Sequence, residues 1–278
     1  MGLTRIASGR AGMGIVAILA VRNEALYLRR CLEHLAAEGI GAAVIDNGST
    51  DGTVAIAREY SPRHVLAIEH LPYRGVNDLR ERMLATDRLR RRLCARWVIK
   101  HDADELLHGR RPGERLAEAI ARADREGATV VNFEEYVFVY EDRERGYEGT
   151  DYYRTMHSYY LFSPRPQRLM RAFRNDLEFD AGRWNGHVLR GERVVVHPES
   201  LVLRHYPALS RAAAVGKLVG RAYPPEALAR GWHRNRQGIT PGMLEPPDPA
   251  LLSRWEDDPR ALDDSRPCAR HFWEWRRG

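Results

Sequence analysis

The stretch of sequence that decides the fold is residues 15–53, IVAILAVRNEALYLRRCLEHLAAEGIGAAVIDNGSTDGT. It opens with seven consecutive apolar residues, 15–21, a pattern typical of a parallel strand that is covered on both faces. Leu28, Leu32 and Leu35 then recur at helical spacing, and a glycine ends that helix. A second apolar run at 42–45 leads into a polar turn. The stretch therefore predicts a strand–helix–strand unit.

The same alternation continues beyond this stretch. Residues 65–68 predict a third strand, residues 76–93 a long arginine-rich helix, and residues 97–100 a fourth strand. Four such alternations predict an α/β fold with a doubly wound, mostly parallel sheet, whose ligands bind beyond the carboxyl ends of the strands. The two turns that are richest in carboxylates, 46–51 and 102–105, fall at those ends.

The residue pattern and composition change along the length of the chain. Residues 1–14 read as a loose lead-in and residues 15–126 as the nucleotide-binding half of one domain. Residues 127–234, with short β-like runs rich in aromatic residues, are expected to form a less regular acceptor half of the same domain. Residues 235–278 are rich in proline and charge, and we expect them to wrap the surface.

The composition is that of an ordinary folded protein with a basic balance. The 278 residues carry a net charge of +6 and a sequence pI near 9.4, and only two of the 44 basic residues, Lys100 and Lys217, are lysines. Guanidinium groups favour phosphate-bearing ligands. The cluster Arg88, Arg90, Arg91 and Arg92 lies in a helical pattern, so we expect a solvated helix face there and no nucleic-acid partner.

The cysteines and the apolar runs bear on the compartment. Three cysteines without short spacing predict reduced thiols in a cytoplasmic protein, and no apolar run is long enough to span a bilayer. The aromatic and basic residues of 271–277 offer the alternative of peripheral membrane contact. Packing of this segment onto the domain is the favoured interpretation.

Asp102 and Asp104 come directly after the fourth predicted strand. In extended backbone, residues i and i+2 point the same way, so both carboxylates can face one hard cation, Mg²⁺ or Mn²⁺. A solvated turn that binds no cation is an equal alternative interpretation of these two carboxylates. An EF-hand is excluded because Leu106 and Leu107 stand where an oxygen ligand and a glycine are needed, and an aspartyl-phosphate phosphatase is excluded by Ser49 at the nucleophile position.

Three motifs in this order resemble the family 2 glycosyltransferases of the GT-A fold, within the nucleotide-diphospho-sugar transferase superfamily. They are the strand at 15–21 running into Arg-Asn-Glu, the turn DNGSTDGT at 46–53, and Asp-Ala-Asp at 102–104 after a strand. The match covers roughly residues 15–126, and the turn at 46–53 is its most specific part.

The resemblance implies roles for individual residues. It implies that a nucleotide-sugar donor contacts Val21, Arg22, Glu24, Asp46, Asp51 and Asp102. Val21 and Glu24 would line the nucleoside pocket, and Asp46 would accept a hydrogen bond from a uracil-type base. The chain departs from the family at Arg22, where many members carry an aromatic residue that stacks on the base. A guanidinium can also stack.

Later motifs are similar to those of the family as well. Asn-Gly-His at 185–187 precedes Val188, where members often carry a glutamate base, so the usual base is missing. Asp180 or His187 would then deprotonate the acceptor, with a slight preference for Asp180. His205, after the strand 201–203, would complete a metal site with Asp102 and Asp104; a hydrogen-bonded strand-end histidine is the alternative.

The resemblance implies a metal-dependent glycosyltransferase with Mn²⁺ or Mg²⁺ as cofactor. It would move a sugar, with inversion, from a nucleotide diphosphate donor, a UDP-sugar being favoured, to a hydroxyl of a glycan, a lipid-linked sugar or a natural product. Two alternatives remain open at this point: a nucleotidyltransferase of the same fold, and a non-enzymatic arginine-rich protein that binds nucleic acid with steep salt dependence. The sequence leaves the acceptor and the oligomeric state open.

Overall fold

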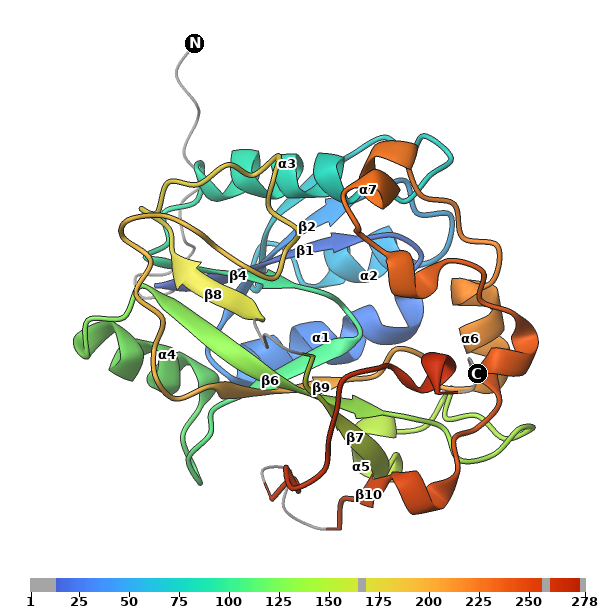
Figure 1. Ribbon diagram of the computed structural model, residues 1–278. Coiled ribbons are helices and arrows are strands. Elements are labelled where there is room, and N and C mark those ends of the chain that lie inside the picture. Colours follow the sequence, from blue (N-terminus) through green and yellow to red (C-terminus); the bar gives the residue numbers. More distant parts are fainter. Residues whose placement is uncertain (1–13, 165–168, 257–260, 276–278) are drawn as a thin grey trace. The chain divides into compact units, whose positions relative to one another are not determined.

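The structure is a computed structural model that describes residues 14–164, 169–256 and 261–275 (Figure 1). The expected lead-in at 1–14 lies outside the described residues except for Gly14. Contacts between residues divide the chain into two compact units. The first unit comprises Met1–Arg74, Asp78–Phe133 and Arg168–Leu201, and the second comprises Gly75–Asn77, Glu134–Gln167 and Val202–Gly278. The units thus interleave along the sequence, and the contiguous ranges expected above stay a prediction.

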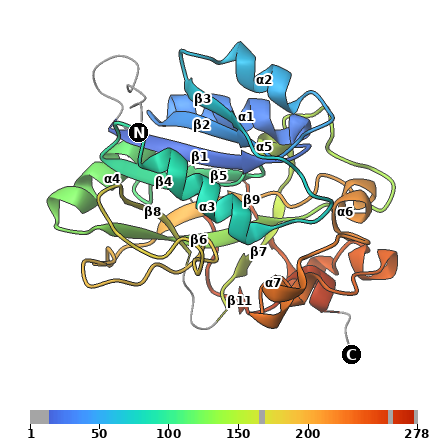
Figure 2. The same ribbon diagram turned by 90° about the horizontal axis from the view of Figure 1, so that it is seen from above.

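The first unit is built on a sheet whose order is β3-β2-β1-β4-β8-β6. The first four strands of this order are parallel, whereas β8 is antiparallel to β4 and β6 to β8. Figure 2 shows β1 between β2 and β4. The strands are β1 (Ile15–Val21), β2 (Gly41–Asp46), β3 (Val65–His70), β4 (Trp97–His101), β6 (Val130–Phe138) and β8 (Met170–Arg174). The predicted α/β class and mostly parallel sheet are confirmed.

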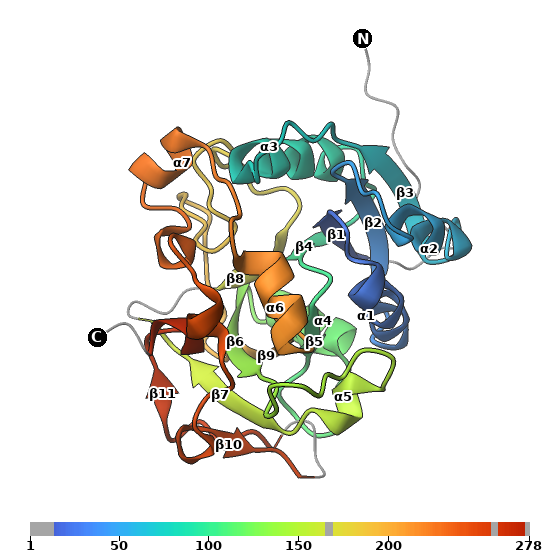
Figure 3. The ribbon, with the colours of Figure 1, turned by 90° about the vertical axis from the view of Figure 1, so that its right-hand side faces the viewer.

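Helices cover both faces of the parallel part of this sheet. Helices α1 and α2 lie on one face and α3 on the other (Figures 1 and 3). Because side chains alternate between the faces of a strand, Val16 and Ile18 of β1 pack into the same core cluster as Met83 and Leu89 of α3. The helices are α1 (Ala25–Ala37), α2 (Thr53–Glu59), α3 (Leu79–Arg90) and α4 (Leu116–Arg125).

Two helix predictions need correction. The apolar spacing of Leu116, Ile120 and Ala123 predicts a helix opened by Pro112. The helix begins at Leu116 instead, because the carboxylate of Glu118 accepts a hydrogen bond from the backbone N–H of Arg115 at 3.0 Å and fixes the first turn there. The arginine-rich helix face is not fully solvated. Arg90 is buried, where it pairs with Asp87 at 2.7 Å.

A short strand, β5 (Glu105–His108), follows the acidic turn immediately. It was not predicted from the sequence. All four of its residues are buried. Its two ends are charged or polar residues, so the apolar run is only Leu106 and Leu107, too short to indicate a strand by pattern.

The second unit holds the remaining sheet. The second half of β6 pairs with β7 (Ser158–Phe162) in antiparallel fashion, and β10 (Ser253–Arg254) and β11 (Pro267–Cys268) also pair with β7 (Figure 3). The other elements are β9 (Leu201–His205), which begins on the last residue of the first unit, α5 (Tyr152–Thr155), α6 (Arg211–Leu218), α7 (Pro225–Ala229), η1 (Arg234–Arg236), η2 (Pro241–Leu244), η3 (Pro249–Leu251) and η4 (Phe272–Glu274).

The sequence predicts a helix opened by Ser210 with Val215, Leu218, Val219 and Ala222 on one apolar face. Helix α6 begins as this pattern predicts and ends earlier. The Ser210 hydroxyl accepts a hydrogen bond from the N–H of Ala213 at 3.0 Å, so Ser210 is the N-cap. The helix ends at Leu218, so Val219 and Ala222, which were expected on its apolar face, lie beyond it.

The C-terminal aromatic segment packs onto the second unit. Phe272 and Trp273 are buried and belong to a core cluster with Val137 and Tyr160. Packing is therefore confirmed for these two rings, and Arg276 and Arg277 lie outside the described residues. Within the part of the chain that the structure describes, no helix has both the length and the apolar character needed to cross a bilayer.

Candidate active site

Two loops meet at the carboxyl edge of the parallel sheet in the first unit. Val21 and Asp46, the last residues of β1 and β2, are partners in the parallel register, so the loops that follow start side by side. The Asn23 side chain accepts a hydrogen bond from the N–H of Thr50 at 2.8 Å, and the N–H of Asn23 donates to Oγ of Ser49 at 3.0 Å. Each loop thus holds the other in place.

The Asp46 carboxylate is buried at the end of β2 and has a neighbour at each oxygen. Its Oδ1 accepts a hydrogen bond from the N–H of Ser49 at 3.0 Å. Its Oδ2 lies 3.5 Å from Nδ1 of His70, at the end of β3. A carboxylate held in this way presents a fixed acceptor geometry to a ligand, which suits the predicted contact with a base.

The other residues of these loops that are predicted to contact the nucleotide-sugar donor have hydrogen-bond partners close by. Val21 is buried, and its carbonyl accepts a hydrogen bond from the N–H of Asn47 at 2.8 Å. The N–H of Glu24 donates to Oγ1 of Thr53 at 2.8 Å. Asp51 accepts hydrogen bonds from the N–H groups of Thr53 and Ala25 at 2.9 and 3.1 Å, so it ties the starts of α2 and α1 together. Burial raises the pKa of Asp51, but the hydrogen bonds from Thr53 and Ala25 outweigh it and leave that pKa below its ordinary value.

The guanidinium of Arg22 stacks on the ring of Tyr73, a residue of the same chain. Its guanidinium carbon lies 3.4 Å from the centre of the Tyr73 ring, and the same group donates to the carbonyl oxygen of Asn47 at 3.1 Å. A cation against an aromatic face is attracted by the ring quadrupole. The two groups form a flat stacked pair beside the loop at 46–53.

The acidic segment at 102–104 forms a turn rather than the extended backbone that was expected. The N–H of Glu105 donates to the carbonyl of Asp102 at 3.2 Å and closes the turn. Strand β5 begins directly after it, at Glu105. The i, i+2 argument for parallel carboxylates therefore does not apply. Asp104 is buried, and the side chain of Asp102 is 27% exposed.

Three cations surround Asp102. Lys100 pairs with its Oδ2, Nη2 of Arg171 lies 3.3 Å from the same oxygen, and Nη2 of Arg82 lies 3.6 Å from Oδ1. Arg171 also pairs with Glu105, whose side chain is only 2% exposed. These groups come from β4, β8, α3 and β5 and form one buried network.

The network shifts the acidity of its members. Burial raises the pKa of the Asp102 carboxyl, but the charges of Lys100, Arg171 and Arg82 outweigh it and hold that pKa well below its usual range. Burial and the neighbouring Arg171 lower the pKa of Lys100. Asp102 is thus an anion whose charge is already balanced within the protein.

The turn at 185–187 lies against this network. Gly186 has φ +80°, and a Cβ atom there would lie 3.5 Å from the side chain of Lys100. Its carbonyl accepts a hydrogen bond from Nη1 of Arg171 at 3.4 Å. His187, the next residue, is exposed. The structure therefore brings the Asn-Gly-His motif at 185–187 to the acidic turn.

Asp180, the other candidate base, lies in an exposed turn of the first unit. Its side chain is 63% exposed, and Oδ1 accepts a hydrogen bond from the N–H of Gly182 at 2.9 Å. Nε of Arg183 lies 3.4 Å from Oδ2.

His205, the predicted third metal ligand, belongs to the second unit. Its Nδ1 lies 2.6 Å from Oε1 of Glu135, and both side chains are almost buried. A carboxylate that accepts from Nδ1–H fixes the tautomer with the lone pair on Nε2, which is the arrangement found in metal-binding histidines. The alternative, a hydrogen-bonded histidine at a strand end, describes the same contact without a metal.

The model of the family described as "Glycosyl transferase family 2" matches residues 16–180, more than half of the chain. The chain belongs to glycosyl transferase family 2. The GT-A fold that the resemblance implied is confirmed, and the matched range contains both interlocked loops and the acidic turn. It ends at Asp180, so the turn at 185–187 and His205 lie beyond it.

Solved structures similar to this family 2 chain are remote. A 1–349 fragment of TarS from S. aureus in complex with UDP-GlcNAc is 16% identical, with a TM-score of 0.41 over 70% of this chain and 58% of that chain. A mannosyltransferase from Pyrobaculum calidifontis in complex with GDP-Man and Mn²⁺ is 22% identical, with a TM-score of 0.33 over 43% of this chain and 35% of that one. This chain thus spans little more than half the length of the TarS fragment and about a third of the length of the mannosyltransferase. No curated protein matches it.

The sequence analysis did not identify the three cations around Asp102. One signal was present, since Lys100 is one of two lysines in an arginine-rich family 2 chain and ends the predicted strand 97–100, whose other residues are apolar. Arg82 and Arg171 gave no such signal, because arginine is common throughout the sequence.

Proposed function

We propose that this protein transfers a sugar from a nucleotide diphosphate donor to a hydroxyl acceptor. The observation that carries the proposal is the convergence of the two interlocked loops and the acidic turn at one edge of a parallel sheet. That edge is where doubly wound sheets bind nucleotides, and the family match covers all three segments.

The nucleoside would bind against the loops that follow β1 and β2. Asp46 offers an acceptor to an N–H of the base, and the N–H of Ser49 orients its carboxylate through Oδ1. The stacked pair of Arg22 and Tyr73 offers a flat cationic face beside it. Both features suit a nucleobase, and a uracil-type base is the one that the resemblance favours.

The acidic turn would offer a carboxylate ligand to a divalent cation. Carboxylate oxygens are the ligands that Mg²⁺ and Mn²⁺ prefer, and Asp104 supplies one such group two residues after Asp102. Because Lys100, Arg171 and Arg82 already balance the charge of Asp102, we assign the larger share of cation binding to Asp104. A bound cation would offset the charge that develops on the leaving diphosphate. His205, the further ligand that the resemblance implies, pairs with Glu135 in the second unit, and its part in metal binding stays a prediction.

The acceptor proton would be taken by Asp180 or His187. Both are exposed, so either can meet an incoming hydroxyl, and His187 follows the glycine that lies against Lys100. Inverting transfer requires such a base.

The decisive experiment is incubation of the protein with UDP-, GDP- and TDP-sugars and Mn²⁺, with chromatographic identification of the products. Release of a nucleoside diphosphate, dependent on an added sugar or lipid-linked acceptor, supports the proposal. Release of pyrophosphate from a nucleoside triphosphate and a sugar phosphate would instead show a nucleotidyltransferase. Salt-dependent retention on DNA or RNA without turnover would favour the non-enzymatic alternative.

A further inference from the structure

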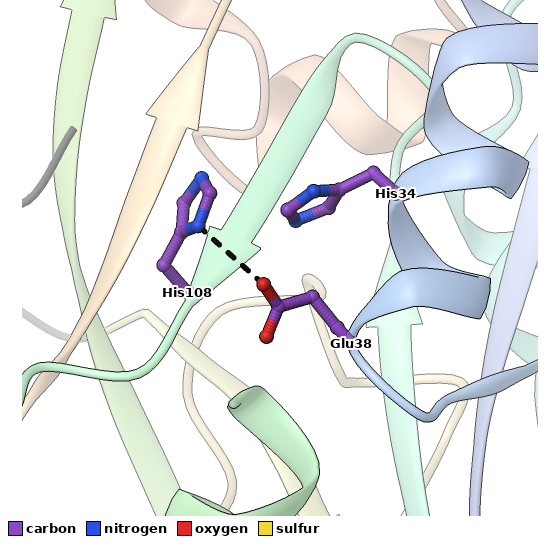
Figure 4. A group of neighbouring side chains, drawn as sticks. All are labelled: His34, Glu38 and His108. Carbon is purple, nitrogen blue, oxygen red and sulfur yellow. Dashed lines mark ion pairs between the residues drawn. The ribbon is translucent and has the colours of Figure 1, made fainter. Parts of the chain in front are cut away.

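Three side chains of types that bind metals come together at the end of α1 (Figure 4). They are His34 and Glu38, which are four residues apart and therefore share a face of the helix, and His108 at the end of β5. One ligand atom from each lies within 4.8 Å of those of the other two. All three residues belong to the first unit.

The rest of the fold holds these side chains in place. Oε2 of Glu38 accepts a hydrogen bond from the N–H of Leu116 at 2.6 Å, which leaves Oε1 facing Nδ1 of His108 at 3.8 Å. The rings of His34 and His108 meet edge to face with centroids 4.6 Å apart. The side chain of His108 is 4% exposed and that of Glu38 12% exposed. The group is thus a preformed and largely buried set of donors.

The electrostatics of the place favour a cation. The last turn of a helix carries a partial negative charge from its carbonyl groups, and Glu38 adds a full charge at the C-cap of α1. The carbonyl oxygen of Leu107 lies 2.7 Å from Nε2 of His34 and adds a further oxygen donor to the surroundings. Two imidazoles and one carboxylate are a ligand set that zinc and related transition metals accept.

We propose that His34, Glu38 and His108 bind one divalent transition-metal ion, with Zn²⁺ as the best-suited ion, and that this ion joins the end of α1 to the end of β5. Atoms bound to one tetrahedral Zn²⁺ lie about 3.3 Å apart, so the ligand atoms, now within 4.8 Å of one another, must close in by up to about 1.5 Å, which small rotamer changes supply. Binding through Nε2 of His34 replaces its contact with the Leu107 carbonyl, and the imidazole retains a proton only on Nδ1.

This site is distinct from the proposed donor site. Helix α1 has 13 residues and is about 20 Å long, so its C-terminal end lies far from Ala25, whose N–H contacts Asp51 in the donor loop. The ion is therefore a structural link between two elements of the first unit and takes no part in holding a diphosphate. The proposal does not depend on the transfer activity.

The test is Zn²⁺ binding by the whole chain after removal of metal with a chelator. The chain is titrated with Zn²⁺ against a coloured competing chelator, and its thermal unfolding is followed with and without the ion. We expect one tightly bound Zn²⁺ per chain, a higher melting temperature with Zn²⁺, and unchanged binding in Asp104→Asn, which lacks the carboxylate assigned to the donor cation. Wild-type protein that takes up no tight Zn²⁺ would overturn the proposal.

Variants of the cluster complete the test. His34→Gln with His108→Gln should abolish tight binding and the rise in melting temperature, whereas His64→Gln, a histidine of the same unit in the loop before β3, should retain both. If the double variant fails to fold, the single variant His34→Gln, which changes a partly exposed residue, must weaken Zn²⁺ at least ~10-fold, since even outer-shell partners of a metal contribute that much. Wild-type affinity in the variants would assign the ion to another place and reject the cluster.

Discussion

Nη2 of Arg171 lies 3.3 Å from Oδ2 of Asp102 and also pairs with the buried Glu105. One guanidinium from β8 therefore holds the two acids that flank the turn 102–105. Arg171 therefore supports the fold directly beside the residues assigned to donor binding. Mutations at Arg171 and at those residues can separate effects on stability from effects on activity.

Removal of Arg171 should destabilise the protein strongly. In Arg171→Met, Glu105 is left as a buried charge without its principal cation, and breaking a buried ion pair in this way costs about 3–5 kcal/mol. Urea unfolding at pH 7 measures the loss. Arg29→Met, which removes an exposed pair with Glu59, is the control and should change the unfolding midpoint little. Equal effects of the two substitutions would show that the buried network contributes no special stability.

Asp104→Ala should abolish turnover, because it removes the carboxylate assigned to the donor cation. The assay is release of nucleoside diphosphate at saturating donor and Mn²⁺. Glu192→Ala, an exposed acid in the same unit, is the matched control and should keep full activity. Retained activity in Asp104→Ala, or full activity of wild type in excess EDTA, would contradict a metal-dependent transfer.

Asp46→Asn should raise the donor KM with little change in kcat, since a contact with the base lies far from the reacting carbon and acts alike on ground and transition states. The amide oxygen can still accept from the N–H of Ser49, so the loop should keep its shape. Steady-state kinetics with varied donor measure both constants. A large fall in kcat alone would mean that the nucleoside binds elsewhere.

The two candidate bases separate by pH profile. If His187 takes the acceptor proton, kcat should fall as the pH drops through about 6.5, the ordinary pKa of an imidazole, whereas a carboxylate base keeps working below that value. Asp180→Asn should lower kcat at least ~100-fold if Asp180 is the base. Losses below ~10-fold in both Asp180→Asn and His187→Ala would reject both assignments and would direct attention to Glu134 and Glu135 on β6.

Glu114 should make stability depend on pH. Hydrogen bonds from Arg122, with Nε donating to Oε1 at 2.8 Å and Nη2 to Oε2 at 3.1 Å, lower the pKa of the Glu114 carboxyl below its ordinary value near 4.3. The stabilisation is therefore complete above about pH 4.3 and is lost as the pH falls through the lower pKa of the folded state. Glu114→Gln should cost about 1.5–3 kcal/mol at pH 7. The difference from wild type should shrink in urea unfolding at pH 3, and a constant difference would exclude the pair as its source.

The sequence predicted the parallel core well because each of its elements carries its own local pattern. The apolar run at 15–21 coincides with β1, and the strands predicted at 42–45, 65–68 and 97–100 are each within two residues of their observed ends. The polar turn at 46–53 then had to fall at the carboxyl edge. Continuous apolar runs and capping residues are local signals, and they need no knowledge of the tertiary structure.

The network around Asp102 could not be predicted in the same way. Ile99 pairs with Ala172 in the antiparallel register of β4 and β8, and this register brings Arg171 beside Lys100. The register depends on packing between segments about 70 residues apart, for which the sequence has no local signal. The turn at 102–104 was missed for a related reason, because the two apolar residues of β5 are too few to show that the chain reverses there.

Strand β6 gives Val130–Phe133 to the first unit and its remaining residues to the second. A chimaera that exchanges the whole second unit for that of a relative would therefore have to be cut inside a hydrogen-bonded strand, and again at each later point where the chain changes unit. Exchange of the second unit between relatives by simple fusion at a linker is thus closed to this protein. A variant with the second unit of a relative would need substitutions in several separate segments of the chain, made together.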